Sequence, residues 1–214
     1  TEEWELEPGD ILYVPPGIAH NGVAVGSDCM TYSVGFRAPS RADLLGHFVD
    51  DMLEQIPEDD LYRDPDLAAQ ANPGEIMPDA LARLHRMTLD SLSDPRAFAR
   101  WFGMFNSTPK YAEMDWRPET PVEADDVRQS IADQAPLSRN PASRLAFVGD
   151  GANAVMFFAD GACFDCGAET ADLARQLCAQ DALVLDAAFA SVDAAIDLLT
   201  QLCNMGCIAF EGED

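Results

Sequence analysis

The stretch Gly9–Ser40, GDILYVPPGIAHNGVAVGSDCMTYSVGFRAPS, combines an all-β pattern with a candidate metal ligand. Three runs in it are rich in β-branched, aromatic or other apolar residues, at 11–14, 23–25 and 29–36. Turns with proline or glycine separate them, which predicts three short strands. Pro15 and Pro16 end the first strand because proline cannot donate a ladder hydrogen bond. His20 follows that bend directly.

The last predicted strand has two unlike faces, because side chains alternate along a strand. One face carries the larger apolar residues, and the other carries small and hydroxyl-bearing ones. The first set is Met30, Tyr32, Val34 and Phe36; the second is Cys29, Thr31, Ser33 and Gly35. The second face is what we expect beside a cavity that holds a polar ligand.

Residues 40–106 carry helical periodicity. Ser40 is a suitable N-cap with Asp43 three positions later, and it precedes a predicted helix over 41–56. A second helix contains Leu81 to Leu92, and a third opens with Asp94-Pro95. Short helices with wide apolar faces predict a helical dimerisation region, with packing on the β region of the same chain as the alternative.

Residues 107–122 contain three prolines and no periodicity, so they predict a linker to a last domain over 123–214. The pattern there predicts helices at 124–134, 170–180 and 191–204, and strands at 144–148, 154–158, 162–165 and 207–210. This α+β order is compatible with a winged-helix-like fold. Neither of its last two helices is basic, which favours an interaction role over direct DNA binding.

The charge of the chain is extreme, with 13 Lys and Arg against 38 Asp and Glu in 214 residues and a net charge of −25. Such a chain repels phosphate backbones and anionic lipid, so unaided nucleic-acid or membrane binding is disfavoured. Two explanations stay open: adaptation to a salty cytoplasm, or steering of a basic partner. The N-terminal residues lack a signal-peptide pattern and no apolar run could span a bilayer, so we expect a cytoplasmic location.

Six cysteines lie in apolar periodic segments, as is typical of reduced buried thiols. Cys163 and Cys166 have zinc-like spacing, but a zinc site would need a second ligand pair at matching spacing. Cys203 and Cys207, at a predicted helix end, are an unusual partner for them. His47 and His85 fall within helix patterns and are more typical of structural histidines.

The sequence around His20 resembles a known metal-binding motif. A Gly-Asp turn, a short apolar strand, a proline bend and a histidine ten positions after Asp10 are similar to the second metal-binding motif of cupin and JmjC proteins. LYVPPGIAHNGVAV (12–25) and CMTYSVGFRAPSRADLL (29–45) resemble the cupin-like JmjC ribosomal oxygenases of bacteria. The resemblance continues through YRDPD (62–66), WFGMF (101–105), STPKY (107–111) and the Leu199, Leu202 and Gly206 pattern.

The resemblance implies a fold and an activity. The fold is α+β: the last strands of a double-stranded β-helix over 1–39, a helical dimerisation region over 40–106, a linker over 107–122 and a winged-helix-like domain over 123–214. The activity is Fe(II)- and 2-oxoglutarate-dependent hydroxylation of an arginine in a large-subunit ribosomal protein by a homodimer. A basic ribosomal protein would suit the acidic surface.

The same resemblance implies roles for three residues. His20 matches the third ligand of a two-histidine, one-carboxylate iron site, a ligand set that leaves coordination positions open for co-substrates. Thr31, and with it Ser33, matches positions near the metal and the 2-oxoglutarate. The first two ligands form a His-x-Asp pair in the family, and no His-x-Asp occurs in these 214 residues. We therefore expect the chain alone to bind iron weakly and to lack activity.

Two other hypotheses remain. One is a non-catalytic dimerisation and interaction scaffold with an incomplete barrel, for which no residue of the chain is catalytic. The other is a different cupin such as a metal isomerase, which the long helical and winged-helix-like tail argues against.

Overall fold

A computed structural model describes residues 3–35, 38–66, 70–110 and 113–211. The chain divides into two compact units, Thr1–Pro39 and Ser40–Asp214. Each unit is described by itself below. No helix in the described ranges is long and apolar enough to cross a bilayer.

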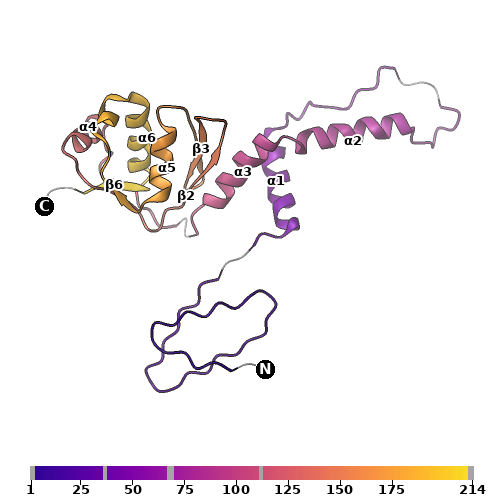
Figure 1. Cartoon of the computed structure of the whole chain (residues 1–214). Coiled ribbons are helices and arrows are strands. Elements are labelled where there is room, and N and C mark those ends of the chain that lie inside the picture. The colour runs from indigo at the N-terminus through magenta and orange to yellow at the C-terminus, as the bar shows by residue number, and fades with distance from the viewer. Residues whose placement is uncertain (1–2, 36–37, 67–69, 111–112, 212–214) are drawn as a thin grey trace. The chain divides into compact units, whose positions relative to one another are not determined.

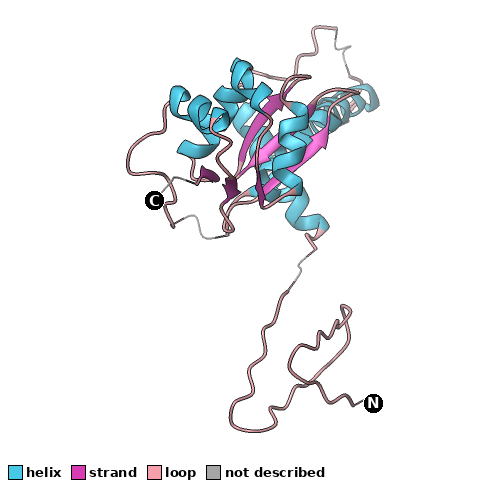
Figure 2. Ribbon diagram, turned by 60° about the vertical axis from the view of Figure 1, so that its left-hand side comes forward, coloured by secondary structure: helices cyan, strands magenta, loops and turns pink. Residues whose placement is uncertain are grey.

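The first unit consists of loops and tight turns (Figure 2). The strands predicted at 11–14, 23–25 and 29–36 are wrong for residues 3–35, where no strand forms; Phe36 lies outside the described residues. A strand needs a partner for its backbone groups and cover for its apolar face. The apolar side chains here are uncovered, with Ile11 96% and Tyr32 82% exposed. The barrel remnant is thus present in the sequence pattern but not in the backbone.

The second unit begins with three helices, coloured purple to pink in Figure 1. They are α1 (Arg41–Gln55), α2 (Pro78–Leu92) and α3 (Pro95–Ser107). The predicted starts of α1 and α3 are confirmed: the Ser40 hydroxyl accepts from the Asp43 N–H at 3.0 Å, and the Asp94 carboxylate accepts from the Arg96 N–H at 2.8 Å. These side chains satisfy N–H groups that have no partner within the helix.

An aromatic cluster joins α1 to α3. Phe48, which is 4% exposed, lies with its ring centroid 5.1 Å from Trp101 and 5.2 Å from Phe98. Trp101 is buried as well and stacks at 5.3 Å on Phe105. Offset and edge-on aromatic pairs at such distances add to the free energy gained by burial. By contrast, α2 contains no buried residue.

The rest of the unit is an α+β domain with two small sheets (Figures 1 and 2). Its helices are α4 (Ala124–Ala132), α5 (Ala171–Ala179), the 3-10 helix η1 (Ala187–Ser191) and α6 (Asp193–Asn204). Its strands are β1 (Leu137–Arg139), β2 (Leu145–Gly149), β3 (Val155–Ala159), β4 (Ala162–Cys166), β5 (Ala182–Leu183) and β6 (Ile208–Phe210). One antiparallel sheet has the order β5-β1-β6 and the other β2-β3-β4.

Strand β3 is buried on both faces. Val155, Phe157 and Ala159 belong to the main core, which also contains Leu173 and Leu199 from the helices α5 and α6. Phe158 alternates to the opposite face, as the period of a strand requires, and lies against α3. The sheet is therefore sandwiched between α3 and the helical core.

The sequence missed three small elements, namely β1, β5 and η1. Strands of two or three residues carry too few side chains to show an alternating pattern. The predicted linker ends where Val122 exchanges two hydrogen bonds with Asn204: the Val122 N–H donates to Oδ1 at 2.8 Å, and Nδ2 donates to the Val122 carbonyl at 2.9 Å. This pair holds the start of α4 against α6.

Candidate functional site

His20 lies in a loop after the turn at Pro16-Gly17, and its side chain is exposed. Its Nδ1 lies 3.1 Å from the carbonyl oxygen of Ile18. In the tautomer with the proton on Nδ1, the ring donates this bond and Nε2 keeps a bare lone pair. Histidines that bind metals in proteins are usually held in this way.

Thr31 and Ser33 lie in the loop after the Gly26–Asp28 bend, and both are exposed. Across the described ranges, no hydrogen bond joins His20 to either residue. Those ranges also contain no group of three or more His, Cys, Asp or Glu that could hold a metal. The residues present thus fit one histidine ligand and not a complete iron site. The assignments of His20, Thr31 and Ser33 stay predictions.

The six cysteines are free thiols, as the sequence predicted. The predicted burial holds for Cys166, Cys203 and Cys207 and is wrong for Cys29, which is exposed. Cys163 and Cys166 lie three positions apart on β4, so their side chains leave opposite faces of the strand. Burial raises the pKa of Cys203 to about 11 and that of Cys207 to about 12. Thiols with such pKa values stay protonated near neutral pH and are poor metal ligands and nucleophiles.

The contact between α3 and the β2-β3-β4 sheet depends on a glycine. A Cβ at Gly103 would lie 2.2 Å from Cζ of Phe158, whose side chain is fully buried. Only the missing side chain lets the helix backbone lie against that ring. The signal for this residue was a glycine within the helical WFGMF pattern, which usually has a packing reason.

Ion pairs at the edge of the same contact connect α3 to β4 and to the turn after β2. The Arg100 guanidinium donates to both Asp165 oxygens at 2.7 Å, and its Nη1 lies 3.1 Å from the Cys163 sulfur. Arg96 pairs with Asp150 at 2.5 Å. The bond from Arg100 lowers the pKa of Asp165, and the bond to Asp165 raises the pKa of Arg100. Because these ion pairs are exposed to solvent, each adds little to the free energy of unfolding.

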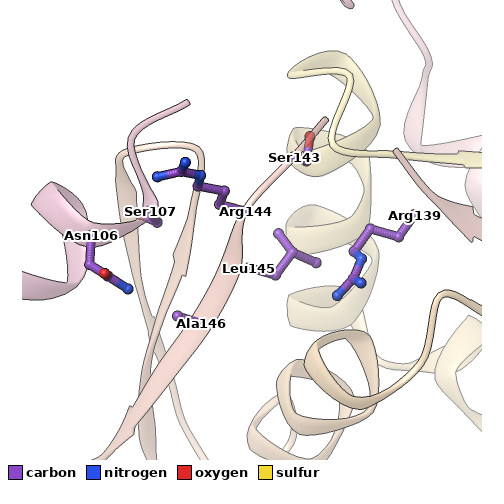
Figure 3. Close-up of a pocket in the computed structure, with 7 residues that line it drawn as sticks. All are labelled: Asn106, Ser107, Arg139, Ser143, Arg144, Leu145 and Ala146. Atoms are coloured by element: carbon purple, nitrogen blue, oxygen red, sulfur yellow. The ribbon is translucent and has the colours of Figure 1, made fainter. Parts of the chain in front are cut away.

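A cavity of about 350 Å³ opens beside this contact (Figure 3). Its wall comes from the end of α3, from β1 and from the turn that leads into β2. The lining residues are Asn106, Ser107, Arg139, Ser143, Arg144, Leu145 and Ala146. A second cavity of about 350 Å³ lies on α2, where Arg83, Arg86 and Asp90 line it together with Asp60.

The electrostatics of the two late helices do not favour groove binding. Arg175 on α5 pairs with Asp172 on the same helix at 2.7 Å, and α6 contains two aspartates and no basic residue. A helix that enters the major groove needs side chains of positive charge for phosphates and base edges.

Comparison with protein families gives two matches. Residues 90–209 match the ROXA-like winged helix, and residues 1–44 match the JmjC domain. The first match includes α3 together with the α+β domain. It supports the winged-helix prediction made from the element order.

Two proteins of known sequence are similar to the chain. The ribosomal protein uL16 3-hydroxylase of Escherichia coli K12 is 38% identical over 147 residues, which cover 68% of this chain and 39% of that protein. A probable ribosomal oxygenase of Haemophilus influenzae is 29% identical over 109 residues, covering 45% of this chain and 25% of that protein. The chain thus spans well under half the length of the relatives it matches.

Solved structures of a ribosomal oxygenase are also similar to this chain. The Escherichia coli ribosomal oxygenase YcfD in complex with cobalt and succinic acid matches with a TM-score of 0.70 at 27% identity, over 84% of this chain and 48% of that one. Its complex with cobalt and 2-oxoglutarate matches with a TM-score of 0.69, also at 27% identity and with the same coverage.

Proposed function

Because the chain belongs to the bacterial JmjC ribosomal oxygenases that carry a ROXA-like winged helix, we propose that it serves in the hydroxylation of a ribosomal protein. The reaction is Fe(II)- and 2-oxoglutarate-dependent, and its target is an arginine side chain of a large-subunit ribosomal protein. The carrying observation is the 38% identity to a uL16 hydroxylase together with the JmjC match over residues 1–44. Cobalt and 2-oxoglutarate in structures of a relative support the cofactor assignment.

In this proposal His20 supplies one of three protein ligands to the iron. The carbonyl of Ile18 fixes the ring so that Nε2 carries the lone pair. The hydroxyl groups of Thr31 and Ser33 offer hydrogen bonds to the carboxylates of 2-oxoglutarate. When bound, iron supplies the activation of dioxygen and the oxidative decarboxylation of 2-oxoglutarate to succinate.

The remaining ligands come from outside this sequence in the proposal, because it contains no His-x-Asp pair. The gene sequence upstream of the Thr1 codon tests this directly. An in-frame sequence that encodes His-x-Asp supports the oxygenase hypothesis. A start codon immediately before Thr1 supports the non-catalytic scaffold and contradicts the enzyme.

The activity test uses the complete gene product with iron, 2-oxoglutarate and a basic ribosomal protein, and it measures succinate formation and hydroxylation by mass spectrometry. His20→Ala should lower turnover by more than about 100-fold, since a lost ligand costs more than a lost outer partner. His85→Ala, at an exposed histidine of α2, is the matched control and should leave turnover unchanged. Unchanged turnover in His20→Ala would reject the ligand assignment.

We further propose that the helical region forms a homodimer. The observation is α2, a 15-residue helix without a buried residue, on which Leu81 is 59% and Leu89 46% exposed. Exposure of such an apolar face to water is unfavourable, so its burial by a partner lowers the free energy. Helix α1 also has exposed leucines, Leu45 and Leu53. A second copy of the chain could cover the leucines of both helices, so we propose a second copy as the partner.

Light scattering coupled to gel filtration tests the dimer. Leu81→Asp combined with Leu89→Asp should convert a dimer into a monomer because it places charges on the covered face. Val184→Asp, at a residue 52% exposed near β5, is the control for an added charge and should leave the mass unchanged. A monomeric wild-type protein would contradict this proposal.

A further inference from the structure

The cavity at the end of α3 has an unusual charge for this chain (Figure 3). Two arginines, two serines and an asparagine line it, and no carboxylate is among its lining residues. In the whole chain acidic residues outnumber basic ones by 38 to 13. A wall of positive and neutral donors in so acidic a molecule concentrates anions locally.

Arg144 is the arginine of the cavity whose charge no described carboxylate balances. Its backbone N–H donates to Asp160 at 2.7 Å, and its Nη1 donates to the Thr108 carbonyl at 3.3 Å. The partner of the guanidinium is thus a neutral carbonyl, and Arg144 forms no ion pair with any described residue. A guanidinium has five N–H donors, so one such bond leaves most of them for a ligand.

Arg139 lines another part of the cavity. Its side chain is only 27% exposed and pairs with Asp181 through Nη2. Figure 3 shows the guanidinium groups of Arg139 and Arg144 on either side of Leu145. The cavity therefore has two arginine positions for an anionic group: Arg144, and the N–H groups of Arg139 that Asp181 leaves free.

The wall between these points is fixed by hydrogen bonds. The Asn140 carboxamide donates to the Gly206 carbonyl at 2.9 Å and accepts from the Ala142 N–H at 2.9 Å. Asp160 accepts from the Ser143 hydroxyl at 2.7 Å as well as from Arg144, so both of its oxygens hold the turn. A wall that is rigid before binding reduces the entropy lost when a ligand is held.

From this arrangement we propose that the cavity binds a small molecule with two carboxylate or phosphate groups. Arginine holds such groups through paired N–H donors, and the carboxamide of Asn106 in the wall can donate a neutral hydrogen bond, whereas the Ser107 and Ser143 hydroxyls already donate to Met104 and Asp160. A volume of about 350 Å³ fits a small metabolite and excludes a folded partner. Every lining residue belongs to the second unit, so the proposal does not depend on the proposed oxygenase activity.

The test follows backbone amide signals of the 214-residue chain by NMR during titration at constant ionic strength. Glutarate, with two carboxylates, should shift the signals of residues 139–146 saturably. Butyrate, which is glutarate without one of its carboxylates, should bind about tenfold more weakly, as should glutarate to Arg144→Gln. Pyrophosphate in place of glutarate shows which anionic group binds more tightly, and tighter binding of either one supports the site.

Two variants serve as controls. Arg175→Gln removes a paired arginine outside the cavity and should leave glutarate affinity unchanged. His20→Ala should also leave it unchanged, which separates this site from the proposed iron site. Arg144→Lys keeps the charge beside the helix end and should bind more weakly than wild type. Equal binding of glutarate and butyrate, no effect of Arg144→Gln, or no saturable shift would each overturn the proposal.

Discussion

Two stretches with strand-like sequences differ completely in the folded chain. Residues 29–35, CMTYSVG, form an exposed loop, and Tyr32 keeps 82% of its surface in water. Residues 155–159, VMFFA, form β3, and every one of them is buried. The difference lies in their partners. Strand β3 has β2 and β4 one short turn away on either side, whereas 29–35 has no strand beside it among the described residues.

The largest expected effect compares one aromatic residue from each stretch. Phe157→Ala removes a fully buried ring from the core and should lower the free energy of unfolding by about 4 kcal/mol. Tyr32→Ala removes an exposed ring and should change it by less than about 0.5 kcal/mol. Urea unfolding followed by circular dichroism measures both. A loss of more than about 1 kcal/mol in Tyr32→Ala would show that the first unit is packed after all.

A smaller effect is expected from adding one methyl group in each region. Gly103→Ala places a Cβ 2.2 Å from the Phe158 ring and should cost about 2 kcal/mol, because helix and sheet must separate. Gly22→Ala meets no atom within 4 Å and should be nearly neutral. Thermal unfolding of the two variants, side by side with wild type, checks the difference. Equal melting temperatures for both variants would disprove the close contact.

The smallest effect concerns Arg100 and its dependence on pH. Arg100→Gln should destabilise the chain by about 0.5 kcal/mol at pH 7, since Asp165 is 59% exposed and solvent screens the pair. The folded pKa of Asp165 lies below its usual 3.8, so its contribution is complete above that pH and disappears as pH falls through the lower value. Unfolding at a series of pH values between 7 and 3 measures this. A difference that grows with acidity would contradict the assignment.

The sequence predicted the second unit better than the first. Helix starts at Ser40 and Asp94 follow from local hydrogen bonds, and the hairpins around β3 follow from turns at Gly151 and Gly161. Such features depend on neighbours in the chain. The strands of residues 11–36 depend on partners that are distant in sequence, so pattern alone could not decide whether they pair.

The candidate sites also differ in how far the sequence could predict them. His20 could be selected because its flanking string resembles a family, and its Nδ1 contact with Ile18 agrees with a ligand role without establishing it. The arginine-lined cavity could not be found in this way. Asn106 is far in sequence from Arg139 and Arg144, and it reaches them only because α3 lies on the sheet.

Gly103 also decides how the protein can be divided for experiments. A fragment that starts after residue 107, at the predicted linker, would contain β2, β3 and β4 but not the helix that covers Phe158. Its exposed ring face would invite self-association. An expression boundary placed before Ser40 instead keeps α3 with its sheet and with Phe48 of α1, so a fragment that contains the winged helix should start there.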